Sequence, residues 1–170
     1  MYGSVPTWLP HSDTLFYVAL SLEKTGRAFR IFRFHLGEAP PHRAEQLDIN
    51  DPVLMPRLTH DGRFLMVMAG LVQPRPYYLL DTKDADGLFA PFLNDLAGKF
   101  KGDIVGDQYI CVTDDGAPRG RVISIPLRTP RDRSSWRQLV PESDVLITDV
   151  VAVLLRRPRP PAPLPRSRSR

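Results

Sequence analysis

The chain has 170 residues, of which 42% are hydrophobic and 25% charged, which is enough apolar material for one domain with a core. No stretch approaches the roughly 20 apolar residues that a membrane helix needs, and no signal-peptide core opens the chain. The single cysteine, Cys111, allows no internal disulfide. These features predict a cytoplasmic protein with no membrane partner.

The net charge of +4 originates at the C-terminal end. Residues 156–170 hold six of the 23 basic side chains and no acidic one. The remaining 17 basic side chains are outnumbered by 19 acidic ones, so the rest of the chain carries a charge of −2. A nucleic-acid-binding domain carries its positive charge on the fold itself. We therefore expect no nucleic-acid partner.

Apolar strands recur along the chain, each after a polar turn. They start near residues 15, 64 and 109. Their spacing of about 45–50 residues is typical of four-stranded propeller blades. A second, more polar strand is expected after each of them, at residues 29–36, 77–81 and 121–127.

The hydrophobic pattern distinguishes two kinds of strand. Phe32, Phe34 and Leu36 alternate with polar residues, which predicts a half-buried strand. Residues 64–68 are apolar on both faces, which predicts a strand buried between neighbours. Residues 87–100 have some helical spacing, but their proline and glycine limit them to a short turn of helix.

The segment from Asp114 to Ile125 indicates two strands joined by a polar turn, and a short acidic connection follows at residues 135–142. The last 15 residues contain five prolines and one large apolar residue, so residues 156–170 are expected to be a disordered tail. The fold predicted for residues 1–155 is all-β, a partial β-propeller of about three four-stranded antiparallel blades.

Several segments resemble, in order, the propeller domain of the prolyl oligopeptidase family of serine peptidases. They are residues 6–10 with 15–17, the run Arg33-Phe34-His35-Leu36-Gly37, the turn and strand at 58–65, and residues 113–153. In that family the resemblance implies seven blades that cover a separate α/β-hydrolase domain and restrict entry to short peptides, which are cleaved after proline. The chain has length for about three blades, so we expect a truncated propeller that serves as a gate only together with a hydrolase domain.

No catalytic residue is predicted. An α/β-hydrolase places its serine at a strand-to-helix elbow within Gly-x-Ser-x-Gly, and no serine here has that setting. The serines in turns, strands or the tail are Ser4, Ser12, Ser21, Ser124, Ser134, Ser135, Ser143, Ser167 and Ser169.

No metal or cofactor site is predicted either. The histidines, His11, His35, His42 and His60, form no zinc spacing, and no glycine-rich phosphate loop occurs. The run Asp84-Ala85-Asp86-Gly87 lacks the acidic residue of a calcium loop, since Leu93 stands in its place.

Three residues have a favoured structural interpretation beside a functional one. His35 is expected to be a hydrogen-bonded structural residue, and Cys111 a buried, unreactive thiol. Trp8 and Trp136 could be binding platforms, and for Trp136 packing between blades is favoured.

Two other functions stay open at this stage. Arg157, Pro160 and Pro163 fit a polyproline ligand, so the chain could be a β-sheet interaction module with a recruiting tail. The Arg-Ser end at 166–170 could contact phosphates of RNA. Because an open arc leaves blade edges and faces uncovered, we also expect self-association and low solubility.

Overall fold

The computed structural model describes residues 6–10, 12–23, 26–37, 43–45, 54–72, 75–84 and 88–151. These residues form twelve strands and one short 3-10 turn, arranged as three antiparallel sheets of four strands. The prediction of an all-β chain with three four-stranded blades is confirmed. Predictions for the tail at 156–170 lie outside the described residues.

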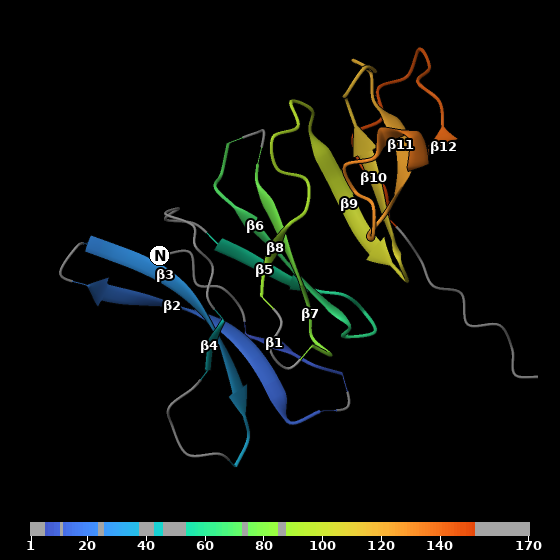
Figure 1. Ribbon diagram of the computed structural model, residues 1–170. Helices are drawn as coiled ribbons and strands as arrows, with labels where there is room; N and C mark the ends of the chain where they lie inside the picture. The colour runs from blue at the N-terminus through green and yellow to red at the C-terminus, as the bar shows by residue number, and fades with distance from the viewer. Residues whose placement is uncertain are drawn as a thin grey trace, which may run out of the picture.

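Each sheet is built from consecutive strands, and the three sheets stand in a row with the second between the other two (Figure 1). The first sheet contains β1 (Thr7–Trp8), β2 (Thr14–Glu23), β3 (Gly26–His35) and β4 (Arg43–Glu45). The second contains β5 (Leu54–Leu58), β6 (Phe64–Ala69), β7 (Tyr77–Asp81) and β8 (Ala90–Pro91). The third contains β9 (Phe100–Val105), β10 (Gln108–Thr113), β11 (Arg121–Pro126) and β12 (Arg137–Val140), with the 3-10 turn Arg133–Ser135 before β12.

The three predicted apolar strands are the second strand of each sheet, and the predicted polar strands are the third. The outermost strands, β4, β8 and β12, are only two to four residues long. The segment interpreted as an acidic connection therefore contains a strand, β12. The prediction of a short helical turn within residues 87–100 is wrong for the described residues 88–100. These residues hold β8 and a turn at Asp95 (φ 65°).

The core lies between the sheets. Along β6, Phe64 and Met66 belong to the apolar cluster shared with the third sheet, whereas Leu65, Val67 and Ala69 belong to the cluster shared with the first. Successive side chains of a strand point to opposite faces, so a strand that is apolar at every position can fill two interfaces. The second sheet is thus buried on both faces, as its sequence predicted.

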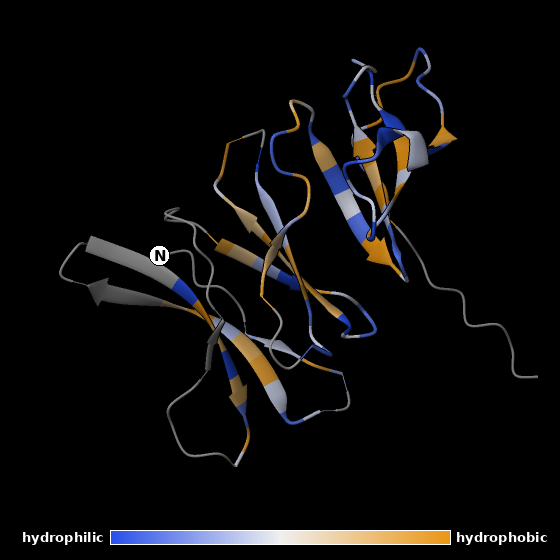
Figure 2. Ribbon diagram, viewed as in Figure 1, coloured by the Kyte–Doolittle hydropathy of each residue, from blue (hydrophilic) through white to orange (hydrophobic). Residues whose placement is uncertain are grey.

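The first strand of the third sheet was missed by sequence reasoning. Figure 2 shows hydrophobic and hydrophilic residues alternating along β9, where Phe100 is buried, Lys101 is exposed and Ile104 is buried. Gly102 lies between them because a Cβ there would come within 1.9 Å of the Ile110 carbonyl oxygen. This period-2 pattern was available in the sequence, but the central glycine concealed it.

The turn from Thr59 to Phe64 joins β5 to β6 and packs against the turn between β1 and β2. Gly62 has φ +73°, and a Cβ at this position would lie 2.5 Å from Cδ of Pro10 in the first sheet. Only glycine combines this backbone conformation with so close an approach. Within the described residues, no helix is long and apolar enough to cross a membrane.

Candidate functional site

Among the described residues, a hydroxyl and an imidazole meet at the end of the first sheet. The Ser12 hydroxyl donates a hydrogen bond to Oγ1 of Thr14 at 3.0 Å, and Thr14 Oγ1 lies 2.7 Å from Nδ1 of His35. Thr14 is buried and paired with His35 across β2 and β3. No carboxylate hydrogen-bonds to His35 in the described residues, and His35 is confirmed as a hydrogen-bonded residue that joins two strands.

The other serine side chains with described contacts make local bonds. Ser124 donates to Gln108 Oε1 at 2.8 Å across β10 and β11. Ser134 donates to Asp132 Oδ1 at 2.6 Å, and Ser135 donates to the carbonyl of Asp132 at 2.7 Å. Ser143 bonds within its own loop. These bonds fix turns and strand register, and none of them pairs a serine with a histidine.

Some candidates lie outside the described structure. They are Ser4, His11, His42, the calcium-like residues Ala85–Gly87, Ser167 and Ser169, while Ser21 is described in its backbone only. In the part of the chain that is described, no three histidine, cysteine or acidic side chains gather closely enough to hold a metal ion.

Cys111 lies in β10 between the second and third sheets. It is fully buried, and burial raises the pKa of its thiol to about 12. A thiol with so high a pKa stays protonated near neutral pH, and the protonated form is a poor nucleophile. The predicted unreactive, buried thiol is confirmed.

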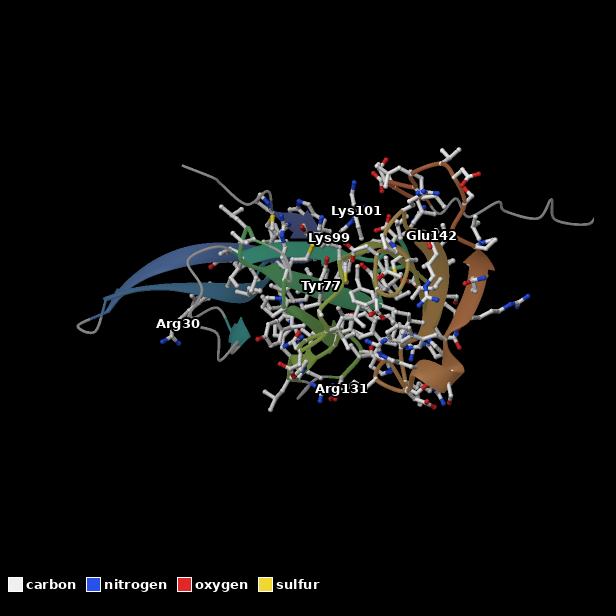
Figure 3. All side chains as sticks on the ribbon, turned by 90° about the horizontal axis from the view of Figure 1, so that it is seen from above. Arg30, Tyr77, Lys99, Lys101, Arg131 and Glu142 are labelled. Carbon is white, nitrogen blue, oxygen red and sulfur yellow. The ribbon has the colours of Figure 1, made fainter. Side chains whose placement is uncertain are left out.

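The interface between the second and third sheets is rich in aromatic rings. Phe92 meets Tyr109 edge to face at 5.4 Å, and Tyr77 donates its hydroxyl hydrogen bond to the carbonyl of Phe100 at 2.5 Å. Figure 3 shows Tyr77 in the middle of the molecule, between the two sheets. Trp136 packs edge to face on Phe100 of its own sheet at 5.8 Å and lies partly buried against this cluster, so its predicted packing role is confirmed, with its ring contact made within the third sheet.

A shallow cavity of about 220 Å³ opens between β5 and β9, the first strands of the second and third sheets. Arg57 and Asp103 face each other across it, with Arg57 Nη2 2.9 Å from Asp103 Oδ1. His60 and Met66 complete part of its wall. Since both charged side chains are partly exposed, the ion pair contributes about 0–1 kcal/mol to stability. The cavity is polar and lies between two sheets. The Thr59 hydroxyl in its wall donates to Asp61 Oδ1, not to the neighbouring His60.

The described serine, histidine and cysteine side chains therefore make structural contacts. The surfaces of the sheets remain as the candidate functional site. The second sheet packs against a sheet on both faces, whereas the first and third sheets each pack against another described sheet on one face only. Trp8, on the edge strand of the first sheet, keeps 49% of its surface exposed.

Comparison with known proteins identifies what this architecture resembles. Residues 1–155 match the family described as prolyl oligopeptidase, N-terminal beta-propeller domain. No curated protein matches the sequence of the chain.

Solved structures share the fold over most of the chain. A structure from a mechanistic study of two prolyl endopeptidases is 25% identical over 84% of this chain, with a TM-score of 0.68, and the alignment covers 22% of that chain. Oligopeptidase B from Leishmania major gives 19% identity, a TM-score of 0.64, and coverage of 82% of this chain and 20% of that one. Prolyl oligopeptidase B from Galerina marginata is 16% identical, with a TM-score of 0.62, and the alignment covers 83% of this chain and 21% of that one. The chain thus spans about a fifth of the length of these enzymes.

Proposed function

The chain belongs to the prolyl oligopeptidase family through its N-terminal β-propeller domain, and on this premise we propose that it supplies three blades of the propeller that restricts access to a serine peptidase active site. We propose further that the chain has no hydrolytic activity of its own. Its role would depend on a hydrolase domain that these three sheets do not include.

The sheet arrangement is the observation that carries this proposal. The second sheet buries Phe64 and Met66 on one face and Leu65 and Val67 on the other. Such two-sided burial is what a blade inside a propeller needs, because each blade packs against a neighbour on both sides. A domain that carried a catalytic elbow would instead need a helix packed on a sheet, and the described residues contain a single 3-10 turn, Arg133–Ser135.

The contacts of the candidate nucleophiles support the non-catalytic part. Thr14 lies between Ser12 and His35. Among the described contacts, therefore, no serine hydroxyl is placed to transfer a proton to an imidazole. The Ser12 hydroxyl accepts from the Thr14 amide at 3.2 Å and donates to the Thr14 hydroxyl, so both of its described bonds stay within the turn before β2.

Hydrolysis of a chromogenic peptide that contains proline tests the non-catalytic proposal directly. We expect no turnover by the purified chain above the rate of a buffer blank. Turnover that a serine-directed inhibitor abolishes would refute this part of the proposal. The variant Ser12→Ala is the matched control, because an activity that persists in it would come from a contaminating peptidase or from another serine.

The gating part needs a hydrolase domain and is tested in a chimera. The three sheets replace the aligned fifth of a prolyl endopeptidase, and cleavage of a short proline peptide is compared with cleavage of an unfolded protein. We expect the chimera to cleave the short peptide and to exclude the protein. A chimera that cleaves both substrates equally well would show that these sheets do not restrict access.

We also propose a compartment for the protein. One free thiol that is buried at Cys111 suits a reducing environment, which supports the cytoplasm as the place where the protein acts.

A further inference from the structure

The segment at residues 141–151, which we call the strap, crosses one face of the third sheet. Residues opposite each other on paired strands share a face, so the strand register places four side chains in one row: Lys101, Val112, Val122 and Val140. The strap leaves β12 directly after Val140, at one end of this row. At the other end, Lys101 Nζ donates a hydrogen bond to Asp149 Oδ2 at 2.6 Å. Figure 3 labels Lys101 and Glu142, near the two ends of this path.

The crossed face is the one that the second sheet does not cover. Cys111 and Ile123 belong to the apolar cluster shared with the second sheet. Their neighbours Val112 and Val122 point the other way, because successive side chains of a strand alternate between the two faces. Val112 and Val122 are nevertheless only 7% and 6% exposed.

Ile147 is a strap residue that lies against this face. A Cβ added at Gly120 would come within 2.6 Å of the Ile147 carbonyl oxygen and 3.4 Å of Ile147 Cβ, and within 3.3 Å of Val112 Cγ1. Ile147 is half-buried, whereas Val145 and Leu146 before it are exposed. The strap therefore holds Ile147 beside Val112 and contributes to the cover of that side chain.

Charged groups hold the strap near both ends. The Arg119 amide donates to Glu142 Oε1 at 2.6 Å, and Arg119 Nη1 donates to Asp144 Oδ1 at 2.9 Å. The hydrogen bond from Lys101 lowers the pKa of Asp149, so this carboxylate stays charged near neutral pH. In both ion pairs each side chain is more than half exposed. Exposed pairs are individually weak and are screened by salt.

Only one described hydrogen bond between backbone groups joins the strap to the sheet. The Ile147 amide donates to the Arg119 carbonyl oxygen at 2.8 Å. Segments with few backbone hydrogen bonds and few buried apolar side chains open locally, at a lower free energy than global unfolding. The strap has both properties, whereas the strands beneath it are joined by continuous ladders.

We propose that the strap is a reversible, salt-sensitive cover of the third sheet. In the closed state it shields the apolar row at Val112 and Val122 from water. In the open state the three sheets stay folded and this row becomes accessible to another surface. Opening breaks the ion pairs to Arg119 and Lys101, so a higher ionic strength shifts the equilibrium toward the open state.

Hydrogen exchange of the Ile147 amide, followed by NMR, measures this opening, because the bond from this amide to the sheet exists only in the closed state. We expect a rise from about 50 to about 500 mM NaCl to speed its exchange about threefold and to leave the β10 amides unchanged. Asp144→Asn and Asp149→Asn should each speed exchange about two- to fivefold at the lower salt concentration. The control, Asp95→Asn, removes an exposed ion pair outside the strap and should have no effect.

A thiol on the covered face tests what opening uncovers. Val112→Cys places a thiol at a position that is 7% exposed. The wild-type chain supplies the background rate of modification, because its Cys111 faces the second sheet. Modification of Val112→Cys should speed with salt, and on addition of Asp149→Asn, by the same factors as exchange of the Ile147 amide.

Three results would overturn the proposal. The Ile147 amide could exchange as slowly as the β10 amides, its exchange could respond neither to salt nor to the variants, or the Val112→Cys thiol could react at a rate unrelated to strap opening. Circular dichroism melts show whether each variant is folded. Lys101→Gln removes the same ion pair from the sheet side if Asp149→Asn does not fold. None of these outcomes depends on the peptidase-gating role.

Discussion

At the scale of single residues, the turn before β6 shows how a short polar sequence fixes the entry to a buried strand. The Thr59 hydroxyl donates to Asp61 Oδ1 at 2.6 Å, and the Arg63 amide donates to the same oxygen at 3.1 Å. The Phe64 amide in turn donates to Thr59 Oγ1 at 3.0 Å. These bonds, with Gly62 in the left-handed conformation, place Phe64 at the start of the strand that fills both interfaces.

The same turn predicts a pH-dependent contribution to stability. The hydrogen bond from Thr59 lowers the pKa of Asp61 below its ordinary value of 3.8, and the Arg63 amide adds to this effect. A lowered pKa in the folded state gives stability that is present above pH 3.8 and is lost as the pH falls through the folded-state pKa. Because Asp61 is mostly exposed, we expect Asp61→Asn to cost only about 0.5–1 kcal/mol at neutral pH.

Urea unfolding of both proteins between neutral pH and about pH 3 measures this contribution. The stability difference between the wild-type chain and Asp61→Asn should shrink as the pH falls. A difference that stays constant over this range would mean that the Asp61 carboxylate does not stabilise the turn.

Cys111 gives a second prediction at the residue scale. Burial raises the pKa of its thiol to about 12, so we expect a thiol reagent at pH 8 to react with it only when the chain opens. The rate of modification should rise steeply in urea, in parallel with the loss of β-sheet circular dichroism. Rapid modification of the folded chain would show that the second and third sheets separate readily at their interface.

At the scale of elements, β6 is the strand on which most of the packing depends. Leu65 is 0% exposed on one face and Met66 is 3% exposed on the other. Truncation of a fully buried leucine or methionine to alanine costs about 2–5 kcal/mol. We therefore expect Leu65→Ala and Met66→Ala to lower the urea midpoint by similar amounts, with little change in slope.

Two matched variants set the scale for this comparison. Leu88→Ala removes a leucine that is 73% exposed and should change stability by less than about 0.5 kcal/mol. Tyr17→Ala, at a half-buried position of β2, should fall between the two extremes. If Leu65→Ala were as mild as Leu88→Ala, the first and second sheets would not share a core in solution.

At the scale of the whole molecule, stability should be graded from the middle of the row to its ends. Hydrogen exchange reports local opening, and amides between covered faces open least often. We expect the amides of β6 and β10 to exchange most slowly, and those of β1, β8 and β12, which are short edge strands, to exchange fastest. Uniform exchange across the three sheets would indicate that they unfold as a single cooperative unit.

Much of the fold was readable from the sequence. The apolar strands at Phe64–Ala69 and Gln108–Thr113 were recognisable because burial on both faces requires an apolar residue at nearly every position. The turns at His60–Arg63 and Asp114–Gly116 were recognisable because tight backbone geometry favours aspartate and glycine. The family resemblance rested on the order of these same segments.

Other features were decided only by the tertiary structure. The short outer strand Arg137–Val140 has no pattern that separates it from a loop, since all four of its side chains are exposed. Nor does alternation along a strand say which neighbour covers which face: Leu65 and Met66 are adjacent in sequence, yet they contact different sheets. Sequence fixes which side chains must leave water, because that depends on each residue's own chemistry. Which surfaces meet depends on how the sheets stack, and residues distant along the chain decide that together.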